Sequence, residues 1–175
     1  MISNKTTKVT YITLNELIKS LSKEGISVYN SIMHSVNIPV EDYIKYTSWS
    51  EDKYTRNCIV SNNKFELVLL CWEKDQITPI HDHDGEECWV KVINGVFREK
   101  IYKENRKGVI SEIKSITLKN NEVTYMKDFM GYHTLENLSE ERAMSLHLYA
   151  KPIKKCKIFN KETKSFATKK LTYCN

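Results

Sequence analysis

The chain has 175 residues and a formal net charge of +5, with 41% apolar and 28% charged residues. These values are ordinary for one soluble globular domain with a hydrophobic core. No apolar run reaches the roughly eighteen residues of a transmembrane helix, so we expect no membrane partner. Residues 1–7 lack the apolar core of a signal peptide, and we therefore expect a cytoplasmic protein.

The five cysteines are irregularly spaced and include no C-x-x-C pair, which argues against a disulfide framework and against a zinc ribbon. The last quarter of the chain is rich in lysine, but these lysines alternate with apolar residues, as on the exposed face of a hairpin. No recognition motif accompanies the charge, so we expect no nucleic-acid partner. We also predict no obligatory protein partner.

The first predicted elements are helices. Thr13–Glu16 has the pattern of a capping box, apolar residues follow at helical spacing, and Gly25 is expected at the C′ position. A second helix is predicted over residues 27–36, and a short one begins at Pro39. Residues 1–48 are therefore predicted to form a helical cap.

From about residue 54 the pattern changes to short extended runs separated by turn residues such as Asn62-Asn63 and Asn94-Gly95. The strands are predicted at residues 55–61, 64–72, 89–93, 96–102, 109–118, 122–126, 132–136, 143–149, 156–159 and 165–171. This pattern indicates a mainly β protein with a small antiparallel barrel and a C-terminal hairpin over residues 54–175. The whole chain, 1–175, is predicted to be a single domain.

The most informative stretch contains His81 and His83. If this stretch is extended, the two imidazoles point to the same face and form half of a metal site. A third candidate ligand is His133, in the segment Gly131–Asn137. The His-Asp-His pair taken alone is equally consistent with a polar loop that binds no metal.

The run from Ala143 to Tyr149 alternates strictly between apolar and polar residues. One face carries Ser145, His147 and Tyr149 and no charged residue. An exposed strand rarely has such a face, so we predict a hydrogen-bonded chain inside a barrel.

The spacing of these motifs resembles the two signatures of the cupin superfamily. The first is H-x-H, a short gap to a carboxylate, then six residues and a glycine, here Gly95; the second places an asparagine, here Asn137, after a histidine. The resemblance implies a cupin-type, jelly-roll barrel with a metal in its mouth. The position of the usual glutamate ligand stays open, because the shorter gap leads to Glu87 and counting back from the glycine leads to Cys88.

Five blocks in the same order resemble the thiol dioxygenases of the cupin superfamily, and specifically the cysteine dioxygenases. The blocks are Tyr54–Asn57, Leu70–Trp72, Ile80–His83 with Cys88, Gly131–His133 with Glu136-Asn137, and Ser145–Tyr149. This resemblance covers most of the chain and implies oxidation of L-cysteine by O2 to cysteine sulfinic acid.

The same resemblance implies that His81, His83 and His133 bind ferrous iron, Fe(2+). Three neutral imidazoles without a carboxylate leave positions on the metal for a substrate thiolate, its amine and dioxygen. The small-molecule partners are then L-cysteine and O2.

The resemblance also assigns residues around the metal. Arg56 matches the residue that holds the substrate carboxylate, a task suited to the planar fork of guanidinium, and Tyr54 lies beside it. Tyr149 matches the active-site tyrosine and Cys88 the cysteine that becomes joined to it by a thioether. His147 and Ser145 match the hydrogen-bonded relay behind the tyrosine.

One departure from the family concerns the residues after this tyrosine, where Ala150-Lys151-Pro152 replaces the common Ser-Pro-Pro. A cis bond before Lys151 would cost about 3 kcal/mol, so it is either absent or enforced by the fold. Three other functions stay open. They are a dioxygenase for another small thiol such as 3-mercaptopropionate, a manganese or zinc cupin with Glu87 as fourth ligand, and a non-catalytic metal-binding cupin.

Overall fold

The computed structural model describes residues 10–174. Its helical elements are α1 (Leu14–Lys23), η1 (Ile26–Val28), α2 (Tyr29–His34), η2 (Val40–Tyr46) and η3 (Asp128–Met130). Its strands are β1 (Thr55–Ser61), β2 (Glu66–Trp72), β3 (Cys88–Asn94), β4 (Phe97–Glu104), β5 (Ile110–Leu118), β6 (Val123–Met126), β7 (Tyr132–Asn137), β8 (Ala143–Tyr149), β9 (Lys155–Asn160) and β10 (Ser165–Lys170). No helix among the described residues is long and apolar enough to cross a membrane.

The start of α1 follows the predicted capping box. The backbone N–H of Glu16 donates to the Thr13 hydroxyl at 3.2 Å, and the Glu16 carboxylate accepts from the Thr13 backbone N–H at 3.2 Å. Gly25 follows the end of the helix in an extended conformation rather than a left-handed one, because the chain enters η1 directly. The second predicted helix is shorter than expected, since residues 26–28 form a 3₁₀ turn and α2 ends at His34.

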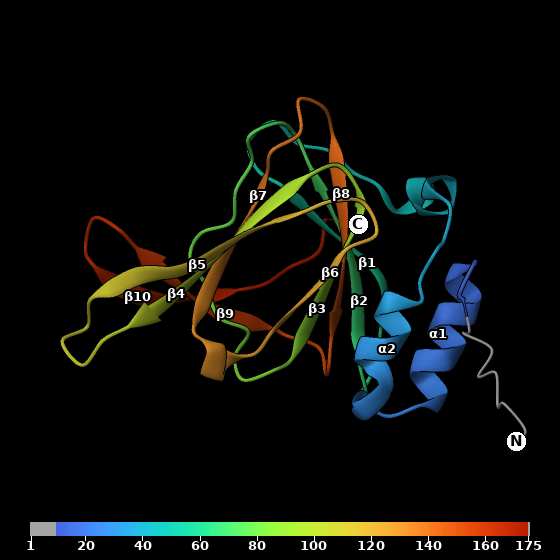
Figure 1. Ribbon diagram of the computed structural model, residues 1–175, viewed down its shortest axis with the longest axis horizontal. Helices are drawn as coiled ribbons and strands as arrows, with labels where there is room; N and C mark the ends of the chain where they lie inside the picture. Colours follow the sequence, from blue (N-terminus) through green and yellow to red (C-terminus); the bar gives the residue numbers. More distant parts are fainter. Residues whose placement is uncertain (1–9, 175) are drawn as a thin grey trace, which may run out of the picture.

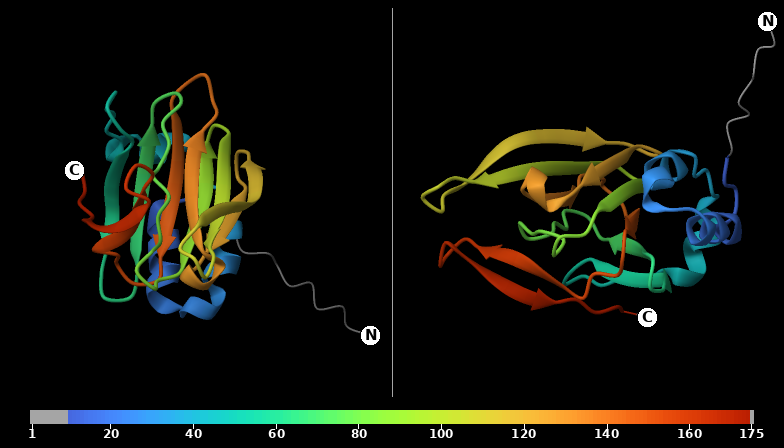
Figure 2. Two further views of the ribbon diagram at one scale, coloured as in Figure 1. Left: turned by 90° about the vertical axis from the view of Figure 1, so that its left-hand side faces the viewer. Right: turned by 90° about the horizontal axis from the view of Figure 1, so that it is seen from below.

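The strands form antiparallel sheets that face each other. One sheet has the order β1-β2-β8-β3-β6, a second β5-β4-β7, and a third β10-β9. His81 joins the second and third sheets, because it forms isolated bridges to His133 on β7 and to Ile158 on β9. Figure 1 shows the resulting barrel-like arrangement, and Figure 2 shows hairpins β4–β5 and β9–β10 reaching away from the helices.

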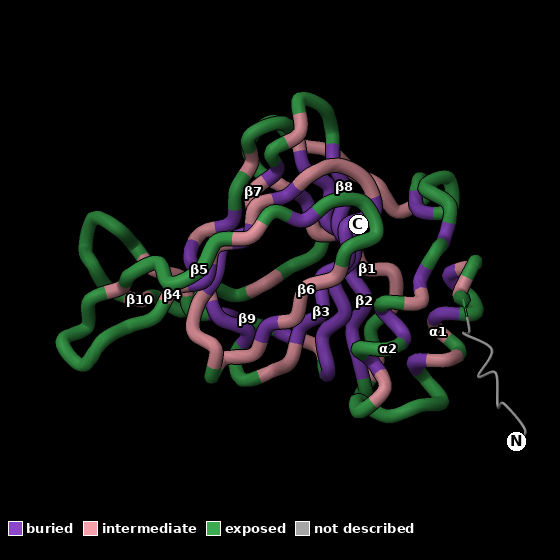
Figure 3. Tube along the Cα trace, in the orientation of Figure 1, coloured by how far each residue is buried: buried purple, intermediate pink, exposed green. Residues whose placement is uncertain are grey.

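Two apolar clusters hold these layers together. An inner cluster between the sheets contains Val68, Leu70 and Val90 among others, and an outer cluster packs α1, α2 and η2 against the other face of the five-stranded sheet. β2 and β8 are therefore buried along their whole length, as the tube in Figure 3 shows. The predicted fold class, mainly β with N-terminal helices, is confirmed; the boundaries at residues 48 and 54 stay a prediction.

Candidate active site

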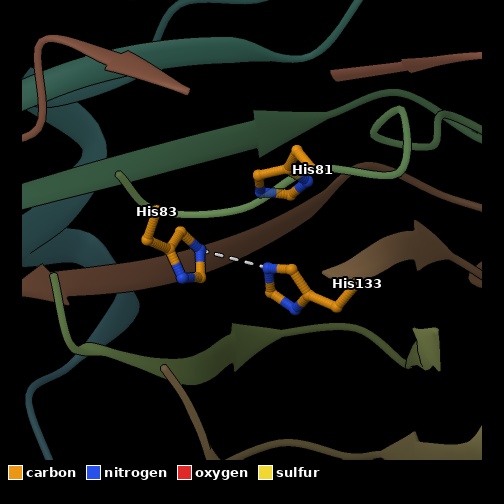
Figure 4. A group of neighbouring side chains, drawn as sticks. All are labelled: His81, His83 and His133. Carbon is orange, nitrogen blue, oxygen red and sulfur yellow. Dashed lines mark hydrogen bonds between the residues drawn. The ribbon is translucent and has the colours of Figure 1, made fainter. Parts of the chain in front are cut away.

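Three histidine side chains converge between the sheets. His81 lies in the segment before β3, His83 lies in the loop that leads from this segment into β3, and His133 lies on β7. Their candidate ligand nitrogens all lie within 4.8 Å of one another, and Nε2 of His83 is 3.1 Å from Nε2 of His133 (Figure 4). Within the pair His81 and His83, only His81 forms β-bridges, and His83 lies in irregular backbone; the two rings nevertheless both point toward His133.

The hydrogen bonds of the rings determine which nitrogens have a free lone pair. Nδ1 of His81 donates to the Pro79 carbonyl oxygen at 3.0 Å, and Nδ1 of His133 donates to the Glu99 carboxylate at 2.7 Å. Both acceptors lack hydrogens, so each Nδ1 carries the proton and each Nε2 is unprotonated. This donor set fits a divalent transition metal, for which neutral imidazole is a common ligand.

Burial keeps the imidazoles of His81 and His83 neutral. Loss of solvent, together with the neighbouring His133, lowers the pKa of His81 to about 3. The same two causes lower the pKa of His83 well below its ordinary value. Neutral rings present lone pairs rather than positive charges, which favours metal binding over ion pairing.

Glu87 lies outside this group. Its carboxylate accepts from Lys127 Nζ at 2.7 Å and from the Tyr125 hydroxyl at 2.8 Å. Burial raises the pKa of Glu87, but the hydrogen bonds from Lys127 and Tyr125 outweigh it, and the net pKa is lowered. Among the described residues, the group that could hold a metal contains the three histidines and no carboxylate, so the geometry does not support Glu87 as a fourth ligand.

A chain of hydrogen bonds lines the interior beside the histidines. Nε1 of Trp72 donates to the Ser145 hydroxyl at 2.9 Å, and this hydroxyl lies 2.8 Å from Nε2 of His147. Nδ1 of His147 lies 3.4 Å from the Tyr149 hydroxyl, which also accepts from Nη1 of Arg56 at 3.3 Å. This is the hydrogen-bonded chain predicted from the alternation of β8.

The direction of each hydrogen bond in this side-chain network is determined by the group that can only donate. Because the Trp72 indole can only donate, the Ser145 hydroxyl directs its own proton to Nε2 of His147. Burial lowers the pKa of His147 well below its ordinary value, so the neutral ring carries its proton on Nδ1 and donates to Tyr149. The Tyr149 oxygen therefore accepts two hydrogen bonds, which leaves its own proton free to face the cavity.

Arg56 extends from β1 into the same interior. It lines a cavity of about 30 Å³ together with Tyr54, His81 and Tyr149. Its Nε and Nη2 are buried without a hydrogen-bond partner. Tyr54 stacks on Trp72 with ring centroids 4.6 Å apart, and Tyr54 and Arg56 also line an adjoining cavity of about 430 Å³. Arg56 therefore lines both cavities, and two of its donors have no hydrogen-bond partner among the described residues.

Comparison with known proteins identifies the family. The family model described as cysteine dioxygenase type I matches residues 1–162. The chain belongs to the cysteine dioxygenase type I family. It is 33% identical over 172 residues to cysteine dioxygenase type 1 of Danio rerio, covering 92% of this chain and 86% of the relative. It is 29% identical over 161 residues to the Homo sapiens protein of the same name, covering 86% and 80%.

A solved structure shares the fold. Oxalate decarboxylase of Lactobacillus farciminis, solved as a formate complex, is 12% identical and superimposes with a TM-score of 0.51, covering 73% of this chain and 34% of that chain. The predicted cupin-type barrel is thereby confirmed. Membership of the cysteine dioxygenase family and the three-histidine group together identify a cupin thiol dioxygenase with a candidate metal site.

The two residues that the family resemblance predicts to be cross-linked lie opposite each other. Cys88 on β3 is the register partner of Tyr149 on β8, so their side chains lie next to each other on the same face of the sheet. Burial is the main cause that raises the pKa of both groups. The thiol and the phenol are therefore both protonated at neutral pH and adjacent.

The departure from the family sequence after Tyr149 has a backbone counterpart. No cis peptide occurs among residues 10–174, and Lys151 has a φ of 87°. Its N–H donates to the carbonyl oxygen of Lys64 at 3.0 Å. Proline can provide neither this φ nor this donor, so this chain closes the turn in a way that a proline at this position could not.

The sequence analysis missed two residues that hold the histidine segments in place. Glu99, which is 0% exposed, holds His133 and accepts from the Thr124 hydroxyl at 2.6 Å. Asp128 accepts from the backbone N–H of His83 at 3.1 Å and of Gly85 at 2.5 Å. Glu99 could have been found as the lone acidic residue on the otherwise apolar inward face of β4, whereas Asp128 follows no periodic pattern.

Proposed function

We propose that the chain is an iron(II)-dependent L-cysteine dioxygenase that converts L-cysteine and O2 into cysteine sulfinic acid. The observation that supports this best is Arg56, which lines a cavity together with His81 and has two buried donors without a hydrogen-bond partner. Two donors of one planar guanidinium fit a carboxylate, and a carboxylate next to a metal site suits a small amino acid whose thiol reaches the metal.

His81, His83 and His133 would hold the ion, and bound iron supplies the redox chemistry between the sulfur and dioxygen. The other groups bind and orient. Arg56 holds the substrate carboxylate, and Tyr149 offers its hydroxyl proton beside it. His147 and Ser145 fix the phenol through the hydrogen-bonded chain, so its proton is presented in one direction.

Two alternatives share this geometry. 3-Mercaptopropionate also carries a carboxylate and a thiol, but it lacks the amine, so Arg56 could bind it as well. A non-catalytic cupin would bind the metal through the same three histidines and form no product. The zinc or manganese cupin with Glu87 as ligand is disfavoured because Lys127 and Tyr125 occupy its carboxylate.

The test combines iron analysis with assays of sulfinate and oxygen uptake, using L-cysteine and 3-mercaptopropionate in parallel. We expect about one iron per chain, sulfinate from L-cysteine and slower uptake with 3-mercaptopropionate. Arg56→Gln should lower kcat/KM for L-cysteine by about a hundredfold, since a charge-assisted pair is lost. Arg98→Gln, which removes a half-buried arginine paired with Glu136, is the matched control.

Each alternative has its own outcome. A clear preference for 3-mercaptopropionate would remove the assignment to L-cysteine. Iron-loaded protein that consumes no oxygen with either thiol would favour the non-catalytic cupin. Glu87→Gln should retain the metal, and loss of metal in this variant would restore the four-ligand alternative.

A further inference from the structure

The last described residues lie against the substrate side of the site. Leu171–Cys174 follows β10, beyond the segment of residues 1–162 that matches the family model. The backbone N–H of Leu171 donates to the Lys154 carbonyl oxygen, and that of Cys174 donates to the Arg56 carbonyl oxygen, both at 2.8 Å. Residues 171–174 are thereby fixed beside β1, as Figure 2 shows.

Tyr173 connects this segment to a buried acid. Its hydroxyl donates to Oε1 of Glu66, the first residue of β2. Glu66 is 1% exposed and lies on the inward face of its strand, which it shares with Val68 and Leu70. A lone carboxylate on an apolar inward face is costly unless it has a partner, so its surroundings determine its role.

The partner is the guanidinium of Arg56. Oε2 of Glu66 lies 3.8 Å from Nη2 of Arg56, which is beyond hydrogen-bond distance. Within the part of the chain that the structure describes, neither atom has a hydrogen-bond partner. The two opposite charges therefore face each other through buried atoms, and Tyr173 holds the carboxylate by its other oxygen.

A substrate carboxylate that binds the free donors of Arg56 must then share this cation with Glu66. The two negative charges would lie within a few ångströms of each other at a largely buried position, where water screens them only weakly, so they repel. A thiol without a carboxylate would not meet this repulsion.

We propose that Glu66 is a specificity-determining residue: it is the built-in counter-ion of Arg56 and limits the affinity for thiols that carry a carboxylate. Tyr173 is the positioning residue that keeps the Glu66 carboxylate away from the guanidinium. This inference rests on the proposed function in one respect, namely that Arg56 receives the substrate carboxylate.

The test is anaerobic titration of the iron-loaded protein with L-cysteine and with 2-aminoethanethiol, which lacks the carboxylate. Glu66→Gln should lower the Kd for L-cysteine by about tenfold and leave that for 2-aminoethanethiol within about twofold. Tyr173→Phe should raise the Kd for L-cysteine several-fold, because the freed carboxylate can close on Arg56. The two substitutions thus act in opposite directions on one ligand.

The chain offers a matched control pair. Glu87 also accepts from a tyrosine hydroxyl and from a cation, but these partners lie away from Arg56. Glu87→Gln and Tyr125→Phe should leave both Kd values unchanged. Unfolding temperatures of all variants separate a local effect from a general loss of structure.

An unchanged or higher Kd for L-cysteine in folded Glu66→Gln protein would overturn the inference. If that variant does not fold, Tyr173→Phe decides, and an unchanged Kd there has the same consequence. The wild-type assay keeps the two proposals apart. If wild-type protein binds L-cysteine but forms no sulfinate, the proposed function is wrong. The Kd values of the variants still decide the role of Glu66 in that case.

Discussion

Glu99 and Lys91 are both almost fully excluded from solvent, and they differ in how their charges are accommodated. Glu99 has a partner on each oxygen, the His133 ring and the Thr124 hydroxyl. Lys91, which is 1% exposed, has one acceptor within residues 10–174, the Asn121 carbonyl oxygen at 3.0 Å from Nζ. A fully paired carboxylate supports its neighbour, whereas an ammonium with unused donors weakens the fold around it.

Glu99→Gln should lower metal affinity by about 10- to 100-fold, because a carboxylate behind a ligating imidazole fixes its tautomer and raises its basicity. Competition with a coloured chelator for Fe²⁺ or Zn²⁺ measures this affinity. Glu112→Gln is the control, since Glu112 is an exposed acid paired with Lys100 on the same hairpin. Equal affinity of wild-type and Glu99→Gln protein would show that the contact with His133 is merely structural.

Burial lowers the pKa of Lys91 from 10.5 to about 8. In the unfolded chain the Lys91 amine has its ordinary pKa of 10.5 and stays protonated up to that pH. Between pH 8 and 10.5 the unfolded state therefore binds more protons, and stability rises with pH across this window. Below pH 8 the cost of the buried charge is present in full, at about 3 kcal/mol.

Lys91→Met should raise the free energy of unfolding by about 2 kcal/mol at pH 7, because the charge is removed and one hydrogen bond is lost. The gain should shrink toward pH 10. Urea denaturation at both pH values measures it, with Lys114→Met, an exposed lysine on β5, as the control. A loss of stability at pH 7 would contradict the assignment of Lys91 as a strained buried cation.

At the scale of elements, the pairing of β3 with β8 brings the chemistry together. Cys88 faces Tyr149, Val90 faces His147 and Val92 faces Ser145 in one register. Because side chains alternate along a strand, a shift of one residue would turn the whole polar chain out of the interior. The distance between thiol and phenol is therefore determined by the sheet rather than by a flexible loop.

This register predicts the thioether cross-link that the resemblance implies. After turnover with L-cysteine in air, a fraction of the protein should be lighter by two hydrogen atoms, which dioxygen removes when sulfur bonds to the phenol ring. Intact-mass analysis detects it, and Cys88→Ser should abolish the lighter species. Cys71→Ser, which alters another buried thiol, should retain it. A mass that stays unchanged after many turnovers would show that Cys88 is not modified and would contradict this prediction.

Sequence patterns predicted the elements better than the contacts between them. The alternation of β8 predicted the interior chain correctly, because its period matches the strand. Glu99 and Glu66 were missed although each is the lone acid on an inward face. Their partners lie on other elements, and strand spacing in one sequence does not indicate which strands become neighbours. Tyr173 was missed for the same reason.

For the whole molecule, the three histidines join separate parts of the barrel. His83 lies in the loop that enters β3 of the five-stranded sheet, and His133 lies on β7 of the facing sheet. His81 links β7 to β9 by backbone bridges. A shared ion would therefore hold the two facing layers together and stabilise the folded state.

Removal of the metal should lower Tm by about 5–10 °C, since a saturating ligand contributes a few kcal/mol to a chain of this size. Calorimetry of metal-loaded and chelator-treated protein measures the difference. His133→Ala should lose the metal-dependent increase, and His34→Ala, an exposed histidine on α2, should keep it. An increase retained by His133→Ala would place the ion elsewhere.

The fold class was predictable because short alternating runs and turn residues are local signals, and the barrel itself follows from them. The sequence did not predict that β2 and β8 are covered on both faces. Helix amphipathicity shows that α1 must bury one side, but it does not show against which strand.

The double covering of the central strands has a dynamic consequence. Amides in β2 and β8 should exchange with deuterium only when the whole domain opens. The hairpin β9–β10, which pairs with the rest of the barrel mainly through residues 80–82, can open at lower cost. One side of the pocket, formed by β2 and β8, is therefore rigid, and the other side, formed by the hairpin β9–β10, can move. We expect thiols to enter and products to leave past the hairpin.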